Sequence, residues 1–121
     1  MNNKFSIKKR INSFGYAIKG VVLFFRTQHN GWIHIASFIV ALAAGFWFHL
    51  TAHEWIAILF ASGFVFTAEI INTSIEFLTD IISPEYNEQA GKVKDLAAAA
   101  VLVASVTALV IGAVIFIPKL F

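Results

Sequence analysis

Three long apolar stretches follow one another along the chain. Residues 31–50 contain no Lys, Arg, Asp or Glu, and residues 54–82 and 92–118 are also dominated by apolar side chains. A helix needs about 20 apolar residues to cross the hydrocarbon core of a bilayer, and each stretch meets that length. The pattern therefore predicts three membrane-spanning helices, the first with Trp32 and Trp47 near its ends as interface anchors.

Residues 1–30 have a different pattern. Apolar residues recur at helical spacing, and polar or basic residues lie between them: the apolar positions are Ile7, Ile11, Phe14, Ile18, Val21 and Phe25. This spacing predicts an amphipathic helix on the membrane surface. A cleaved signal peptide is the alternative, but Lys19 and Arg26 leave between them an apolar run that is too short for its hydrophobic core.

The connections between the apolar stretches indicate an orientation. Six Lys and Arg residues precede the first span and two lie between 85 and 95, whereas the short turn near residues 51–53 has none. Basic residues favour the cytoplasmic side, so the N-terminus and the polar loop 83–91 are expected there. Pro84 is expected to end the second helix or to begin a new one.

Composition agrees with a membrane protein. The chain has 121 residues, of which 59% are hydrophobic and 13% charged, which is too apolar for a soluble domain. Cysteine is absent, so disulfide and thiolate chemistry are excluded. No nucleic-acid-binding motif is visible. We expect one all-α integral membrane domain over residues 1–121.

The second apolar stretch contains a row of polar side chains that a purely structural span would not need. At about 100° per residue, Glu69, Thr73, Glu76 and Asp80 fall on one face of a helix and Asn72 flanks them. We call these five residues the polar stripe. A carboxylate in hydrocarbon costs about 3 kcal/mol, so the stripe predicts a wet or paired site.

Three helices have little interior in which to hide three acids, so the polar stripe is expected to face a neighbouring subunit or an interfacial cleft. Small residues at fourfold spacing also favour close helix packing in lipid. They are Ser37, Ala41 and Gly45 in the first span and Ala100, Ala104, Ala108 and Gly112 in the third. An oligomer is therefore expected.

The polar stripe and the lysines Lys92 and Lys94 are expected on the same side of the membrane. Carboxylates bind Mg²⁺ and lysines neutralise phosphate oxygens, so together they suit phosphoryl transfer. The Walker A pattern is absent, because Gly91-Lys92 lacks its first glycine and its hydroxyl residue. Two other interpretations remain open: polar pairs that only hold helices together, and a proton or ion pathway.

The motif Glu69-x-x-Asn72-Thr73-Ser74-Ile75-Glu76-x-x-x-Asp80, followed by Lys92-x-Lys94-Asp95-x-Ala97-Ala98-Ala99-Ala100-Val101, resembles the signature of the small prokaryotic membrane lipid kinases, the diacylglycerol kinase and undecaprenol kinase family. The resemblance extends to Gly15-Tyr16 and Lys19-Gly20 and covers nearly the whole chain. It implies a homotrimer in the bacterial cytoplasmic (inner) membrane. It also implies that ATP, with Mg²⁺ as cofactor, phosphorylates a lipid hydroxyl at the cytoplasmic interface.

The resemblance also implies roles for single residues. Glu69 matches the general base that takes the proton of the lipid hydroxyl, and Asn72 and Asp80 support the polar site. Glu76 matches a metal-binding carboxylate. The implied ATP contacts are Lys9, Arg10, Tyr16, Gln28, Glu76, Glu85, Tyr86, Asn87, Lys94 and Asp95. Lys9 and Arg10 both lie near the single basic N-terminal position of the family and are alternatives for it.

Gln28 departs from the family pattern, which has a glutamate there as the second metal carboxylate. Gln28 keeps a carbonyl oxygen but has lost the charge, so weaker metal binding or a catalytically weak relative remains open. The lipid is also open between diacylglycerol, which would give phosphatidic acid and is favoured here, and undecaprenol. The four histidines, His29, His34, His49 and His53, are interpreted as interface residues rather than zinc ligands.

Overall fold

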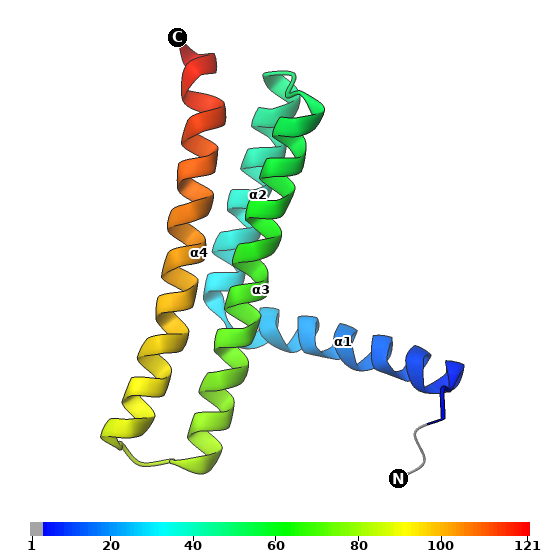
Figure 1. Ribbon diagram of the computed structural model, residues 1–121, viewed down its shortest axis with the longest axis vertical. Coiled ribbons are helices and arrows are strands. Elements are labelled where there is room, and N and C mark those ends of the chain that lie inside the picture. The colour runs from blue at the N-terminus through cyan, green and yellow to red at the C-terminus, as the bar shows by residue number, and fades with distance from the viewer. Residues whose placement is uncertain (1–3) are drawn as a thin grey trace.

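The computed structural model describes residues 4–121, so the first three residues of the expected surface segment 1–30 lie outside the described part. Within it the chain forms four α-helices: α1 (Ile7–Thr27), α2 (His29–Trp47), α3 (Ala52–Ile82) and α4 (Glu88–Leu120). Helices α2, α3 and α4 run alongside one another, and α1 projects away from them (Figure 1). The three bundled helices are long and apolar enough to cross a membrane. The predicted all-α fold with three candidate spans is confirmed.

The break between α1 and α2 is a single residue. Gln28 has extended backbone angles, φ −119° and ψ 110°, and its N–H still bonds the Phe24 carbonyl at 2.9 Å. A Cβ at Gly31 would lie 2.9 Å from the Phe24 ring, so this glycine lets the start of α2 pack closely on the end of α1. Helix α2 therefore begins at His29, before the residue 31 expected from the apolar pattern.

The turn between α2 and α3 is fixed by a capping box. The Thr51 hydroxyl accepts the Glu54 N–H, and the Glu54 carboxylate accepts the Thr51 N–H. Because these bonds satisfy the first free N–H groups, α3 begins at Ala52, earlier than the expected residue 54. Lys119 at the end of α4 pairs with Glu54 at 3.0 Å and ties the two helix ends together.

The connection between α3 and α4 is shorter than the expected loop 83–91. Asn87 Oδ1 accepts the N–H groups of Gln89 and Ala90, an N-cap that starts α4 at Glu88. Residues 88–91 are therefore helical, and the connecting loop is confined to residues 83–87.

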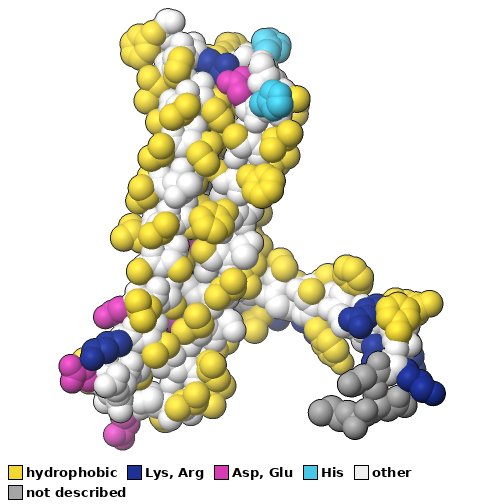
Figure 2. Space-filling model, viewed as in Figure 1, with side chains coloured by type: hydrophobic (Ala, Val, Ile, Leu, Met, Phe, Trp, Pro, Cys, Tyr) yellow, Lys and Arg dark blue, Asp and Glu magenta, His cyan; other side chains and the backbone are white. Residues whose placement is uncertain are grey.

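Most large apolar side chains point outward, as a chain surrounded by lipid requires (Figure 2). The small core consists of Leu50, Ile58 and Ile115, with Trp55 packed against it. Helix α3 packs against α4 most extensively and also contacts α2 and α1. Two of the small residues have clear packing roles, because Ala104 is fully buried and Gly45 lies against the Trp55 ring.

Candidate active site

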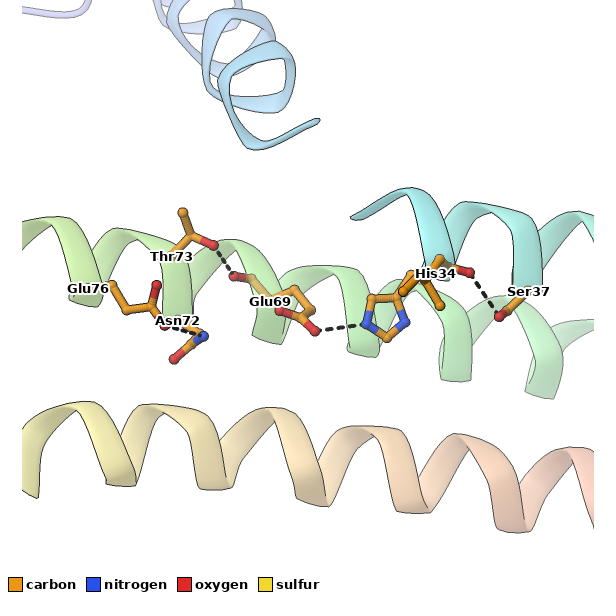
Figure 3. A network of polar contacts seen from close by, with 7 residues as sticks. His34, Ser37, Glu69, Asn72, Thr73 and Glu76 are labelled. Atoms are coloured by element: carbon orange, nitrogen blue, oxygen red, sulfur yellow. Dashed lines mark hydrogen bonds and ion pairs between the residues drawn. The ribbon is translucent and has the colours of Figure 1, made fainter. Parts of the chain in front are cut away.

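Glu69 lies at the centre of the site, on the inward face of α3. Only 5% of its surface is exposed, although it belongs to a candidate membrane span. Its Oε1 lies 2.8 Å from Nε2 of His34, which comes from α2 (Figure 3). Thr73, one turn further along α3, is buried and donates its hydroxyl proton to the Glu69 carbonyl at 2.9 Å. The acid is therefore enclosed and hydrogen-bonded within a single chain.

The next pair lies on the same helix. Asn72 donates an amide proton to Glu76 Oε1 at 3.3 Å, and both side chains are partly buried (Figure 3). Asn72 Oδ1 is buried and has no hydrogen-bond partner among residues 4–121. A buried carbonyl oxygen without a partner is costly, so this atom is a candidate ligand for a bound group.

The third pair crosses from α3 to α4. Lys94 Nζ donates to Asp80 Oδ1 at 2.6 Å, and the two side chains are 43% and 61% exposed. At 1.5 Å per residue, Asp80 lies about 16 Å along α3 from Glu69. The polar stripe thus runs from a buried acid to an exposed ion pair at the end of the bundle where α3 and α4 are joined.

Each acid of the polar stripe has a hydrogen-bond partner, which agrees with the expectation of a paired polar site. Within this chain, His34 and the packing of α2 on α3 bury Glu69. The expectation that the polar stripe faces a neighbouring subunit or an interfacial cleft stays a prediction.

Sequence reasoning missed His34 as part of this site. A signal existed: His34 lies 13 residues before the end of α2 and Glu69 lies 17 residues after the start of α3, so their distances from the α2–α3 turn differ by about one helical turn. In an antiparallel helix pair, residues equally far from the turn lie side by side. A histidine in a charge-free span, within about one helical turn of the level of Glu69, is therefore a candidate partner for the buried acid.

Eight of the ten candidate ATP contacts fall into two groups, and the other two are Gln28 and Glu76. Lys94 and Asp95 lie in the first turns of α4, next to the loop that carries Glu85 and Tyr86. Tyr86 is 90% exposed, and the Asn87 side chain is engaged in capping α4. These five residues share one end of the bundle.

Lys9, Arg10 and Tyr16 are exposed on α1, and the structure does not bring them to Lys94 within this chain (Figure 1). Arg10 lies over the ring of Phe5 instead. Figure 2 shows basic side chains gathered on the far part of α1.

The described residues offer oxygen ligands but no preformed cluster for a metal ion. Among residues 4–121 no group of three or more His, Cys, Asp or Glu is arranged to hold one. Gln28 makes no side-chain hydrogen bond in this part of the chain, and none joins it to Glu76. The unpartnered Asn72 Oδ1 beside the Glu76 carboxylate nevertheless suits Mg²⁺, which binds through one or two protein oxygens and completes its shell with phosphates and water.

An apolar cavity is lined by His34, the hydrogen-bond partner of the buried acid. It has a volume of about 520 Å³ and lies between α2, α3 and α4. His34 and Phe66 line it near Glu69, and Leu109 and Phe116 of α4 line it further along the bundle. A hydrocarbon chain in this cavity would bring a polar head group toward Glu69.

Comparison with known proteins places most of this chain in one group. The profile of the family described as prokaryotic diacylglycerol kinase matches residues 15–116. The undecaprenol kinase of Bacillus subtilis strain 168 is 36% identical over 114 residues, which cover 94% of this chain and 93% of that protein.

Other relatives are named diacylglycerol kinase. The protein of Synechocystis strain PCC 6803 is 35% identical over 109 residues, 89% of this chain, and the match spans 62% of its own length. The protein of Escherichia coli strain K12 is 29% identical over 116 residues, which cover 90% of this chain and 89% of that protein.

Proposed function

We propose that this chain, which belongs to the prokaryotic diacylglycerol kinase family, is a lipid kinase that transfers the γ-phosphate of ATP to a lipid primary hydroxyl. The observation that carries the proposal is the position of Glu69. It is a buried acid in a candidate span, and its hydrogen-bond partner His34 lines an apolar cavity. That position suits a group that must meet the head of a lipid rather than a soluble substrate.

The chemistry follows from this position. Glu69 accepts the proton of the lipid hydroxyl while the hydroxyl oxygen forms a bond to the γ-phosphorus and ADP leaves. Oε2 is the atom for this task, because Oε1 is engaged by His34 and Oε2 makes no hydrogen bond among residues 4–121. Lys94 neutralises phosphate oxygens, and its ammonium group donates a hydrogen bond to Asp80.

Mg²⁺, when bound with ATP, would neutralise phosphate charge, with Glu76 as the principal ligand and Gln28 and Asn72 as oxygen donors. Glu85, Tyr86, Asn87 and Asp95 are proposed to contact the nucleotide from the end of the bundle that carries Lys94. Lys9, Arg10 and Tyr16 are proposed to contact it from α1.

The proposed setting is the bacterial inner membrane, with the N-terminus and the α3–α4 connection in the cytoplasm. The basic residues that precede α2, together with Lys92 and Lys94 in the first turns of α4, support this orientation. Helix α1 is proposed to lie on the membrane surface, since its apolar side chains are exposed and its basic ones lie between them. A homotrimer is proposed as the assembly.

Diacylglycerol is proposed as the first substrate and undecaprenol as the second. Sequence identity does not separate them, because a relative of each name matches at 35% or 36%. Both lipids present a primary hydroxyl, so the same site serves either.

The test is phosphorylation of each lipid by purified protein in detergent with labelled ATP and Mg²⁺. Radiolabelled lipid extracted into organic solvent supports the proposal, and its chromatographic identity assigns the substrate. ATP-independent proton flux in vesicles without phosphorylated lipid would instead support the ion-pathway interpretation, for which the buried His34 and Glu69 pair is the relevant observation.

A further inference from the structure

The polar side chain closest to the proposed base comes from another helix. We propose that His34 is a positioning residue: its Nε2–H donates to Oε1 of Glu69 and holds the carboxylate so that Oε2 meets the lipid hydroxyl. This inference rests on the proposed kinase function and adds to it a residue that acts through the base.

Among residues 4–121, the carboxylate of Glu69 has a single hydrogen-bond partner. The side chain of Glu69 is 7% exposed, and within residues 4–121 its carboxylate bonds no group other than His34. Thr73 bonds the Glu69 backbone carbonyl and leaves the carboxylate alone. Without the imidazole, no hydrogen bond among residues 4–121 would hold the Glu69 carboxylate in one rotamer.

The imidazole is itself held in place. The Phe66 ring packs edge-on against His34, with ring centroids 6.1 Å apart. The centroid of the Phe66 ring also lies 6.3 Å from that of the Phe25 ring. Trp32 Nε1 donates to the Phe25 carbonyl at 2.9 Å. The end of α1, the start of α2 and the middle of α3 are thus locked together around His34. A base oriented in this way is pre-organised for proton transfer.

Nε2 acts in this proposal as a donor, so a titratable ring is not required. Glutamine at position 34 has an amide N–H that reaches about as far as Nε2, whereas leucine has similar bulk and no donor. The pair of variants therefore separates hydrogen bonding from packing. His53 is exposed in the first turn of α3, about 24 Å from Glu69 along the helix. The same two substitutions at His53 are therefore matched controls.

The experiment measures kcat and the KM for ATP in lipid phosphorylation. His34→Leu should lower kcat roughly 10- to 100-fold with the KM for ATP nearly unchanged, because a base displaced by about 1 Å loses rate without losing nucleotide contacts. His34→Gln should restore kcat to within about fivefold of the natural chain. His53→Leu and His53→Gln should leave both constants unchanged. A natural rate in His34→Leu, or equal rates in His34→Leu and His34→Gln, would overturn the proposal.

A second measurement does not depend on turnover. In protein labelled with ¹⁵N-histidine, the His34 Nε2 resonance is identified by its loss in His34→Gln. Glu69→Gln should shift that resonance, whereas Glu76→Gln should not, since Glu76 bonds Asn72. An unmoved resonance in Glu69→Gln would show that the contact is absent and overturn the proposal. A natural chain that phosphorylates no lipid but shows the shift would overturn the proposed function and leave the contact established.

Discussion

Gly45 is the glycine at which an added Cβ would come closest to another residue, and replacing it tests the packing of α2 on α3. A Cβ at position 45 would lie 2.4 Å from Cη2 of Trp55 and 2.9 Å from two further atoms of the same indole. The indole has little room to move, because the Phe46 ring lies 5.0 Å away on one side and the core packs on the other. Gly45→Ala should therefore force the two helices or the indole apart.

The magnitude follows from two opposing terms. Overpacking by one methyl group costs about 1–3 kcal/mol, and alanine gains about 1 kcal/mol over glycine in helix propensity. The net effect of Gly45→Ala is a destabilisation of about 0–2 kcal/mol. A Cβ added at Gly63 would meet no atom within 4 Å, so Gly63→Ala has only the favourable propensity term. The difference between the two variants, about 1–3 kcal/mol, isolates the indole contact.

The assay is reversible unfolding in mixed micelles with increasing SDS, followed by circular dichroism. Gly45→Ala should unfold at a lower SDS fraction than the natural chain, and Gly63→Ala at a higher one. In a Trp55→Leu background the penalty of Gly45→Ala should disappear, because the clashing ring is gone. Equal stability of the two alanine variants would refute the packing of α2 on α3 described here.

Three further predictions concern the site and its orientation. Lys94→Ala should raise the KM for ATP roughly 10- to 150-fold, the equivalent of about 1.5–3 kcal/mol for a charged hydrogen bond. Asp80→Asn should change the KM for ATP less than about fivefold, because an exposed ion pair contributes about 1 kcal/mol or less. Steady-state kinetics measure both variants, and equal effects on the KM would contradict the assignment of Lys94 as an ATP contact. Gln28→Glu should lower the Mg²⁺ concentration for half-maximal rate, and an unchanged requirement would remove Gln28 from the metal site. The chain has no cysteine, so single-cysteine variants can be labelled in cells with an impermeant maleimide. The reagent should label Ala52→Cys directly and Tyr86→Cys only after permeabilisation. The reverse pattern would contradict the proposed orientation, in which the α3–α4 connection is cytoplasmic.

The sequence predicted the number and kind of helices because membrane spans depend on the length and polarity of a stretch, which are local properties. It did not predict where the helices begin. Thr51 and Asn87 set the starts of α3 and α4 through side-chain caps, and these bonds extend both helices beyond the apolar stretches. The sequence also did not predict the direction of α1 relative to the other helices, because that direction depends on how Gly31 packs on Phe24.

The site was partly visible for a similar reason. The helical spacing of Glu69, Thr73 and Glu76 on one face is a local pattern, so the polar stripe was predictable. The partners on other helices were less so. The pairing of His34 with Glu69 depends on the register of α2 against α3, and that of Lys94 with Asp80 depends on the length of the α3–α4 loop.

The most direct test of the central claim is lipid phosphorylation by Glu69→Gln, measured together with ATP binding. The substitution keeps the size of the side chain and a hydrogen-bonding group near His34 but removes the base. We predict that the variant binds ATP as the natural chain does and forms no phosphorylated lipid above background. Turnover at the natural rate would contradict the account, because the buried acid would then have no part in the reaction.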